Sequence, residues 1–232
     1  MRAFRVNFTN RRQAVTGVFS SRHGRLSSGL CAIARAMGLA WRGLCGYTIG
    51  LQMGAALAET TGISWTDSTF NPWIGCTKVS PGCDNCYASV STPARSMRIV
   101  WGAGQPRHRT TPQNWKTPEF WNGQHEAFKT TYGRRRRVFC ASLADVFDNE
   151  VQNQWRTDLF ALIDRTPNLD WLILTKRVGN VLPMLQEIGR DRLPVNVWQG
   201  ISAVNQDEAR RDLPKLARLD ATVRWVSYEP AL

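Results

Sequence analysis

The stretch Leu169-Asp-Trp-Leu-Ile-Leu-Thr-Lys176 is an apolar run that ends on polar residues, and it decides the fold class. Its length and its β-branched and aromatic content are typical of a β-strand. Comparable runs occur at residues 137–142, 195–202 and 223–229. We therefore predict a strand at each of these four places, and a first strand at Ile63–Trp65.

Apolar residues at helical spacing fill the intervals between these runs. Residues 150–165, residues 178–189 and residues 209–217 each place apolar side chains on one face, although Pro183 disturbs the second segment. Strands that alternate with helices at this spacing indicate βαβ units and a parallel sheet. We expect an α/β fold in which residues 89–132 form helix and loop insertions.

Three cysteines lie in the glycine- and proline-containing segment Asn71–Ala88. They are Cys76, Cys83 and Cys86, with the spacing C-x6-C-x2-C. Three thiolates can bind a metal ion or an iron–sulfur cluster, but a closed site needs one ligand more. An iron–sulfur cluster held in this way would keep one iron open for a small molecule.

A structural zinc ion is the alternative. It would need a fourth ligand, for which the nearest candidates are Cys140, His108 and His125. Cys140 lies inside a predicted strand, where a cysteine is more often a small buried apolar residue than a ligand. We therefore favour the cluster, and we expect the protein in the cytoplasm, because thiolate ligands must stay reduced.

Polar side chains follow the predicted strands at their carboxyl ends, where parallel α/β folds bind ligands. The cysteine loop would follow the first strand at the same edge. We expect a cofactor or substrate to be bound there by Ser142, Asp145, Lys176, Arg177, Ser202, Asn205 and Glu229. Asp145, Asp148 and Glu150 are also candidates for general acid–base groups, or for acids that stabilise a helix start. Lys176 and Arg177 form either an anion site or a solvated helix start.

The net charge of +12 is concentrated at the amino end of the chain. Residues 1–52 carry eight arginines and neither lysine nor acid, which leaves 22 basic and 18 acidic residues in the remainder. The basic character is therefore not evidence that the folded domain binds nucleic acid. We expect residues 1–58 to be a disordered extension, or the product of a start assigned too early with Met53 as the true start, rather than an export signal. The absence of any long uncharged apolar run predicts no transmembrane helix and no membrane partner.

The arginine run Arg134–Arg137 precedes a strand. It is a candidate for binding phosphates, with stacking partners upstream at Trp115, Phe120, Trp121 and Tyr132. The alternative, which we favour, is a solvated strand start beside core aromatic residues. This run carries the second functional hypothesis, a non-enzymatic module that is stabilised by zinc or a cluster and binds nucleic acid.

The segment Ile63–Ala88 closely resembles the opening of the phage gene-product-37/68 family, three-Cys-motif proteins carried as a domain of unknown function. Later segments resemble further motifs of that family in the same order: Ser142–Phe147, Leu174–Arg177, Gly200–Ser202 with Asn205 and Gln206, and Ser227–Pro230. The family is in turn similar to radical S-adenosylmethionine (SAM) enzymes. In those enzymes three cysteines hold a 4Fe–4S cluster, and SAM binds the fourth iron.

The resemblance implies a partial parallel (β/α) barrel. It also implies an enzyme that cleaves SAM to a 5′-deoxyadenosyl radical and needs an electron donor as partner. The substrate is unknown, and nucleic acid is one hypothesis for it. Three positions depart from the pattern: the usual cysteine spacing is C-x3-C-x2-C, Asn85 replaces an aromatic residue, and Val204 replaces an acid. Family members also continue beyond the last residue of this chain. We therefore expect the barrel to be incomplete at the carboxyl end, and an inactive fragment is a third hypothesis.

Overall fold

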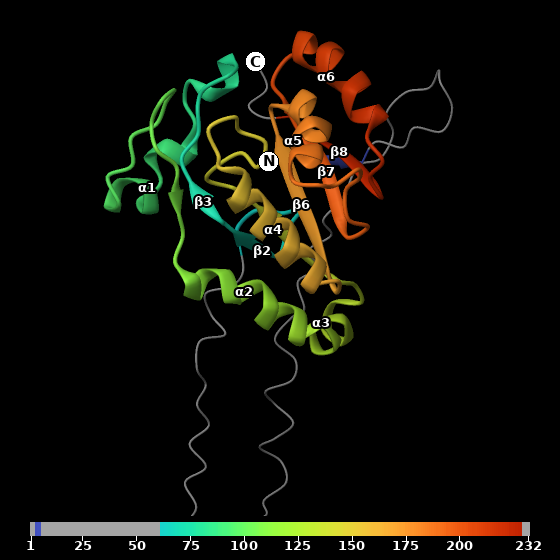
Figure 1. Ribbon diagram of the computed structural model, residues 1–232. Helices are drawn as coiled ribbons and strands as arrows, with labels where there is room; N and C mark the ends of the chain where they lie inside the picture. Colours follow the sequence, from blue (N-terminus) through green and yellow to red (C-terminus); the bar gives the residue numbers. More distant parts are fainter. Residues whose placement is uncertain (1–2, 6–60, 229–232) are drawn as a thin grey trace, which may run out of the picture. The chain divides into compact units, whose positions relative to one another are not determined.

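The computed structural model describes residues 3–5 and 61–228, and its centre is a six-stranded sheet in the order β1-β8-β7-β6-β5-β2 (Figure 1). Five strands are parallel: β2 (Ser68–Phe70), β5 (Arg136–Cys140), β6 (Leu169–Thr175), β7 (Val197–Ala203) and β8 (Val223–Tyr228). The sixth strand, β1 (Ala3–Arg5), pairs antiparallel with β8. The predicted α/β class with a parallel sheet is confirmed.

Each parallel strand lies beside the next one in the chain, apart from the short β3 and β4, which form a sheet of their own. The connections carry α4 (Asn153–Arg165), η3 (Val178–Asn180) with α5 (Val181–Glu187), and α6 (Gln206–Arg218). Crossovers between parallel strands are right-handed, so connections that all advance in one direction put their helices on the same face of the sheet. One core contains residues of all three helices, such as Leu159, Leu185 and Leu216, together with Trp171 and Ile173 of β6.

The opposite face of the sheet carries aromatic residues. Trp65, Phe139, Leu172 and Trp225 form a separate buried cluster, and the Trp65 ring lies 4.8 Å from the ring centroids of both Phe139 and Trp225. A Cβ atom on Gly200 of β7 would lie 2.4 Å from the Trp225 ring, so this close packing requires glycine. Alternate residues of the strands therefore fill two cores, one between the sheet and the helices and one on the opposite face, which includes Trp225.

The predicted first strand at Ile63–Trp65 is wrong. These residues form a turn, in which the Thr66 amide donates to the Ile63 carbonyl, and the Trp65 ring packs on the aromatic face. The first parallel strand is β2 instead, which is three residues long. The cysteine loop nevertheless follows this strand, as expected.

The segment from the cysteine loop to β5 forms the expected insertions. It contains β3 (Trp73–Ile74) paired with β4 (His108–Arg109), the short turns η1 (Pro81–Cys83) and η2 (Tyr87–Val90), and the helices α1 (Thr92–Ser96), α2 (Pro112–Gly123) and α3 (His125–Tyr132). Within residues 61–228, no helix has both the length and the apolar character needed to cross a membrane. The expectation that residues 1–58 are disordered concerns residues outside the described part of the chain. Ala3–Arg5 are the exception, because they form the strand β1.

Candidate functional site

The cysteine loop is fastened over the loop that follows β5. The amide of Gly75 donates to the carbonyl of Leu143 at 3.1 Å, and the Tyr87 hydroxyl donates to the carbonyl of Ser142 at 2.9 Å. Asn71, just after β2, exchanges hydrogen bonds with the Ser142 hydroxyl and accepts one from the Leu143 amide. The loop is thus held at the carboxyl edge of the parallel sheet, where sequence reasoning placed it.

A glycine of the same loop lies against the ends of β6 and β7. A Cβ atom on Gly82 would be 2.3 Å from Cγ1 of Val204 and 3.3 Å from Nζ of Lys176. Only a residue without a side chain fits at this distance. The loop therefore reaches from the end of β5 across to Lys176 and Val204, with Cys83 next to the point of contact.

Arg177 connects the first cysteine to the sheet. Its guanidinium donates to Sγ of Cys76 at 3.5 Å and to the Thr77 carbonyl at 2.7 Å, and it pairs with Asp145 at 3.0 Å. Burial alone would lower the pKa of Arg177, but the charges of Asp145 and Asp148, together with the Cys76 sulfur, outweigh burial and raise it. Arg177 is consequently a permanent cation beside the Cys76 thiol.

The Cys76 thiol holds its proton tightly. Burial, reinforced by the charge of Asp145 and only partly offset by Arg177, raises the pKa of Cys76 to about 12. The group is therefore a neutral thiol near pH 7. A metal ligand must be the thiolate, so any metal bound by Cys76 has to displace this proton.

Asp145 is satisfied by donors of its own chain. Its carboxylate accepts hydrogen bonds from the Thr175 hydroxyl at 2.8 Å, the Phe147 amide at 2.9 Å and the Lys176 amide at 3.2 Å, in addition to the ion pair with Arg177. The residue is 5 % exposed. Asp145 thus positions the end of β6 beside the cysteine loop. The sequence had suggested cofactor binding or acid–base chemistry for this residue, and it gave no sign of this positioning role.

A second buried cation, Arg107, contacts the cysteine loop at Thr77. Nε of Arg107 donates to Asp148 at 2.9 Å, and its Nη2 donates to the Thr77 hydroxyl at 2.6 Å and pairs with Glu150 at 3.1 Å. Asp148 and Glu150, considered above as acid–base groups or helix-start acids, are therefore partners of Arg107. Sequence reasoning missed Arg107 and Thr77, because nothing in the local pattern around either residue signals a contact made across the fold.

Two other residues expected at the carboxyl edge of the sheet do meet there. Nζ of Lys176 donates to the Ser202 hydroxyl at 2.6 Å, so the ends of β6 and β7 present an amine and a hydroxyl together. Asn205, by contrast, caps α6 by accepting from the Glu208 amide at 2.9 Å, the usual role of asparagine before a helix. Glu229 lies outside the described residues.

The donor chemistry of the cysteine loop fits an iron–sulfur cluster. Cys76, Cys83 and Cys86 are free thiols of intermediate exposure. Within residues 61–228, however, no three Cys, His, Asp or Glu side chains are arranged as a ready-made set of metal ligands. Cys140, considered as a fourth zinc ligand, is fully buried in the core, which raises the pKa of its thiol, and Nδ1 of His125 lies 2.9 Å from the Asn122 carbonyl.

The arginine run lies at the other end of the sheet, where β5 begins. Arg134 binds both carboxylate oxygens of Asp67, Arg135 pairs with Asp170, Arg136 stacks on Phe128 and donates to Ser68, and Arg137 lies over Trp198. These contacts engage all four guanidinium groups with other residues of the chain. The run therefore lies at a strand start, as we favoured, but ion pairs and ring contacts hold it there instead of solvent.

The fold and the site define an α/β protein whose parallel sheet carries a loop with three free cysteines at its carboxyl edge. The family described as "Protein of unknown function (DUF5131)" matches residues 60–232, and the chain belongs to this family. Neither the comparison with curated proteins nor the comparison with solved structures gave a match.

Proposed function

We propose that the chain is an iron–sulfur protein of the radical SAM type, in which Cys76, Cys83 and Cys86 ligate a 4Fe–4S cluster. One observation carries the proposal: three free thiols lie on a single loop that is fastened to the carboxyl edge of a parallel sheet. The resemblance to the phage three-Cys-motif family supports the same assignment. The cluster, when bound, supplies the electron that cleaves SAM.

A partial (β/α) barrel is the architecture that we propose for the sheet. Its strands follow one another in chain order, and the helices of the crossovers share one core. A doubly wound sheet would instead reverse its order at a switch point. In a partial barrel the aromatic face around Trp225 is the interior, and the cysteine loop lies over its mouth.

The chain's own residues have three tasks in this proposal. Arg177 holds Cys76 in place and offsets the negative charge of its thiolate once a metal has displaced the proton. Lys176 and Ser202 offer a cation and a hydroxyl at the mouth for SAM or the substrate. Asp145 keeps the end of β6 in register with the loop. A cytoplasmic location and a separate electron donor complete the proposal, because the thiolates must remain reduced.

The test is anaerobic reconstitution of the full chain with iron and sulfide. We expect a brown protein with broad visible absorbance and about four iron atoms per chain. Incubation with a strong reductant and SAM should release 5′-deoxyadenosine. The variants Cys76→Ala, Cys83→Ala and Cys86→Ala should each lose iron, whereas Cys140→Ala, the matched control in the core, should keep it. A colourless protein with one tightly bound zinc ion would refute the proposal.

The second functional hypothesis, a nucleic-acid-binding module, rested on Arg134–Arg137. These arginines are engaged with Asp67, Asp170, Phe128 and Trp198 at the opposite end of the sheet. The contacts give each arginine a role in anchoring β5, so they do not favour that hypothesis.

A further inference from the structure

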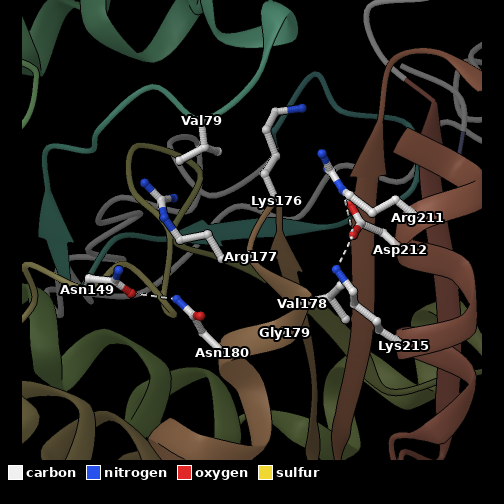
Figure 2. A pocket seen from close by; sticks show the side chains of 10 residues that line it. All are labelled: Val79, Asn149, Lys176, Arg177, Val178, Gly179, Asn180, Arg211, Asp212 and Lys215. Atoms are coloured by element: carbon white, nitrogen blue, oxygen red, sulfur yellow. Dashed lines mark hydrogen bonds and ion pairs between the residues drawn. The ribbon is translucent and has the colours of Figure 1, made fainter. Parts of the chain in front are cut away.

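A pocket of about 310 Å³ opens beside the cysteine loop, between the turn that follows β6 and the helix α6 (Figure 2). Lys176 and Arg177 line it from the turn, and Arg211, Asp212 and Lys215 line it from α6. Val79 of the cysteine loop is a further lining residue. The volume is at the lower end of the range for small-molecule sites, about 300–1,000 Å³.

The walls of this pocket carry an excess of positive charge. Arg177 is already balanced by Asp145 at 3.0 Å, with Asp148 at 3.8 Å. Asp212 balances one of the two basic residues of α6, because Arg211 lies 2.6 Å and Lys215 3.2 Å from its carboxylate. Lys176 donates to the hydroxyl of Ser202, which is a neutral group. Three cations against one carboxylate leave an excess of two positive charges in the walls.

Asp212 stays ionised in this setting and serves to hold the cations. Burial alone would raise its pKa, but the hydrogen bonds and the positive charges of Arg211 and Lys215 together outweigh burial and lower it below the ordinary value. The carboxylate therefore fixes both basic side chains on one face of α6, one helical turn apart. The remaining donors of Arg211 and Lys215 are left for a ligand.

We propose that this pocket binds a phosphate monoester, carried by a small sugar phosphate or by the phosphorylated end of a nucleic acid. At pH 7 such a group has a charge of about −1.5 to −2 and three strong acceptor oxygens, which match the excess charge and the donors of Lys176, Arg211 and Lys215. This pocket shares Lys176 with the proposed SAM or substrate site, but binding of the monoester requires neither cluster nor SAM.

The test uses the full chain and calorimetric titration with ribose 5-phosphate, with ribose as the uncharged control at matched ionic strength. A trinucleotide with a 5′-phosphate and the same trinucleotide without it form the second pair. We expect binding in each pair only when the monoester is present, and the stronger of the two phosphorylated ligands identifies the carrier. Equal behaviour of the phosphorylated and unphosphorylated members in both pairs would overturn the proposal.

Variants locate the site. Arg211→Gln should weaken the phosphorylated ligand by on the order of tenfold, the loss expected for one charge-assisted hydrogen bond. Arg218→Gln makes the same change on the same helix, outside the pocket, and should leave the affinity within about twofold. Lys176→Gln is the second pocket variant, and it does not disturb the Asp212 cluster. Binding that responds equally to Arg211→Gln and Arg218→Gln, and not to Lys176→Gln, would show that the pocket is not the site.

Discussion

Arg177 donates a hydrogen bond to the sulfur of Cys76 at 3.5 Å, across a separation of 101 residues in the chain. The same guanidinium pairs with Asp145, which accepts hydrogen bonds from the residues that end β6. One cation thus links the first cysteine of the loop to the central strand of the sheet. The position of the loop depends on an ion pair as well as on backbone contacts.

Arg177→Gln should therefore destabilise the fold by about 3 kcal/mol, because it leaves the buried Asp145 without its cation. The side chains of this pair are 9 % and 7 % exposed. Urea unfolding of the full chain measures the change. Arg210→Gln removes a surface pair with Asp207, whose side chains are 73 % and 93 % exposed, and should cost less than about 1 kcal/mol. Similar costs for the two variants would contradict this role of Arg177.

Gly82→Ala should push the cysteine loop away from β7, because its Cβ would lie 2.3 Å from Cγ1 of Val204. We expect a loss of about 1–3 kcal/mol in the free energy of unfolding, typical of overpacking. Val204→Ala should recover part of this loss in the double variant, a coupling that a double-mutant cycle measures. Gly123→Ala is the control, since a Cβ there has open space. Additive effects of the two substitutions would show that Gly82 and Val204 do not touch.

The thiol of Cys76 should be slow to react in the folded protein. Its pKa rises from 9.0 to about 12, so the folded state holds roughly a thousandfold less thiolate at pH 8 than the unfolded chain. Alkylation by iodoacetamide, followed by mass spectrometry in buffer and in urea, measures the ratio. The protonated thiol favours the folded state below about pH 9, and this contribution to stability is lost as the pH rises toward 12. Equal alkylation rates with and without urea would contradict the burial of Cys76.

Asp212 should contribute stability with the opposite dependence on pH. Its folded pKa is lowered, so the contribution is present above the unfolded pKa and is lost as the pH falls through the folded value. Asp212→Asn should therefore destabilise the protein near pH 7, by up to about 1 kcal/mol because both partners are partly exposed, and the difference from the parent should vanish in acid. Thermal unfolding across this pH range measures it. Asp220→Asn, an exposed carboxyl near the end of α6, should show no such convergence.

Apolar runs predicted β5, β6, β7 and β8 well, because each strand is buried and its sequence shows it directly. The strand β2 was placed five residues early, since Ser68–Phe70 is too short and too polar to show a pattern, whereas Trp65 next to it resembles a strand residue. The approach of Lys176 to Ser202 followed from strand order alone. The buried Arg107 and the α6 cations could not be predicted, because their contacts join segments that only the tertiary fold brings together.

The antiparallel pairing of β1 with β8, in the register Ala3↔Ser227, has a topological consequence. Trp225–Ser227 of β8 are already paired on that side, so a sixth parallel strand can pair with them only after Ala3–Arg5 has been displaced. Two strands can therefore compete for this edge of the sheet. The one that pairs with β8 determines whether the parallel order ends at β8 or continues.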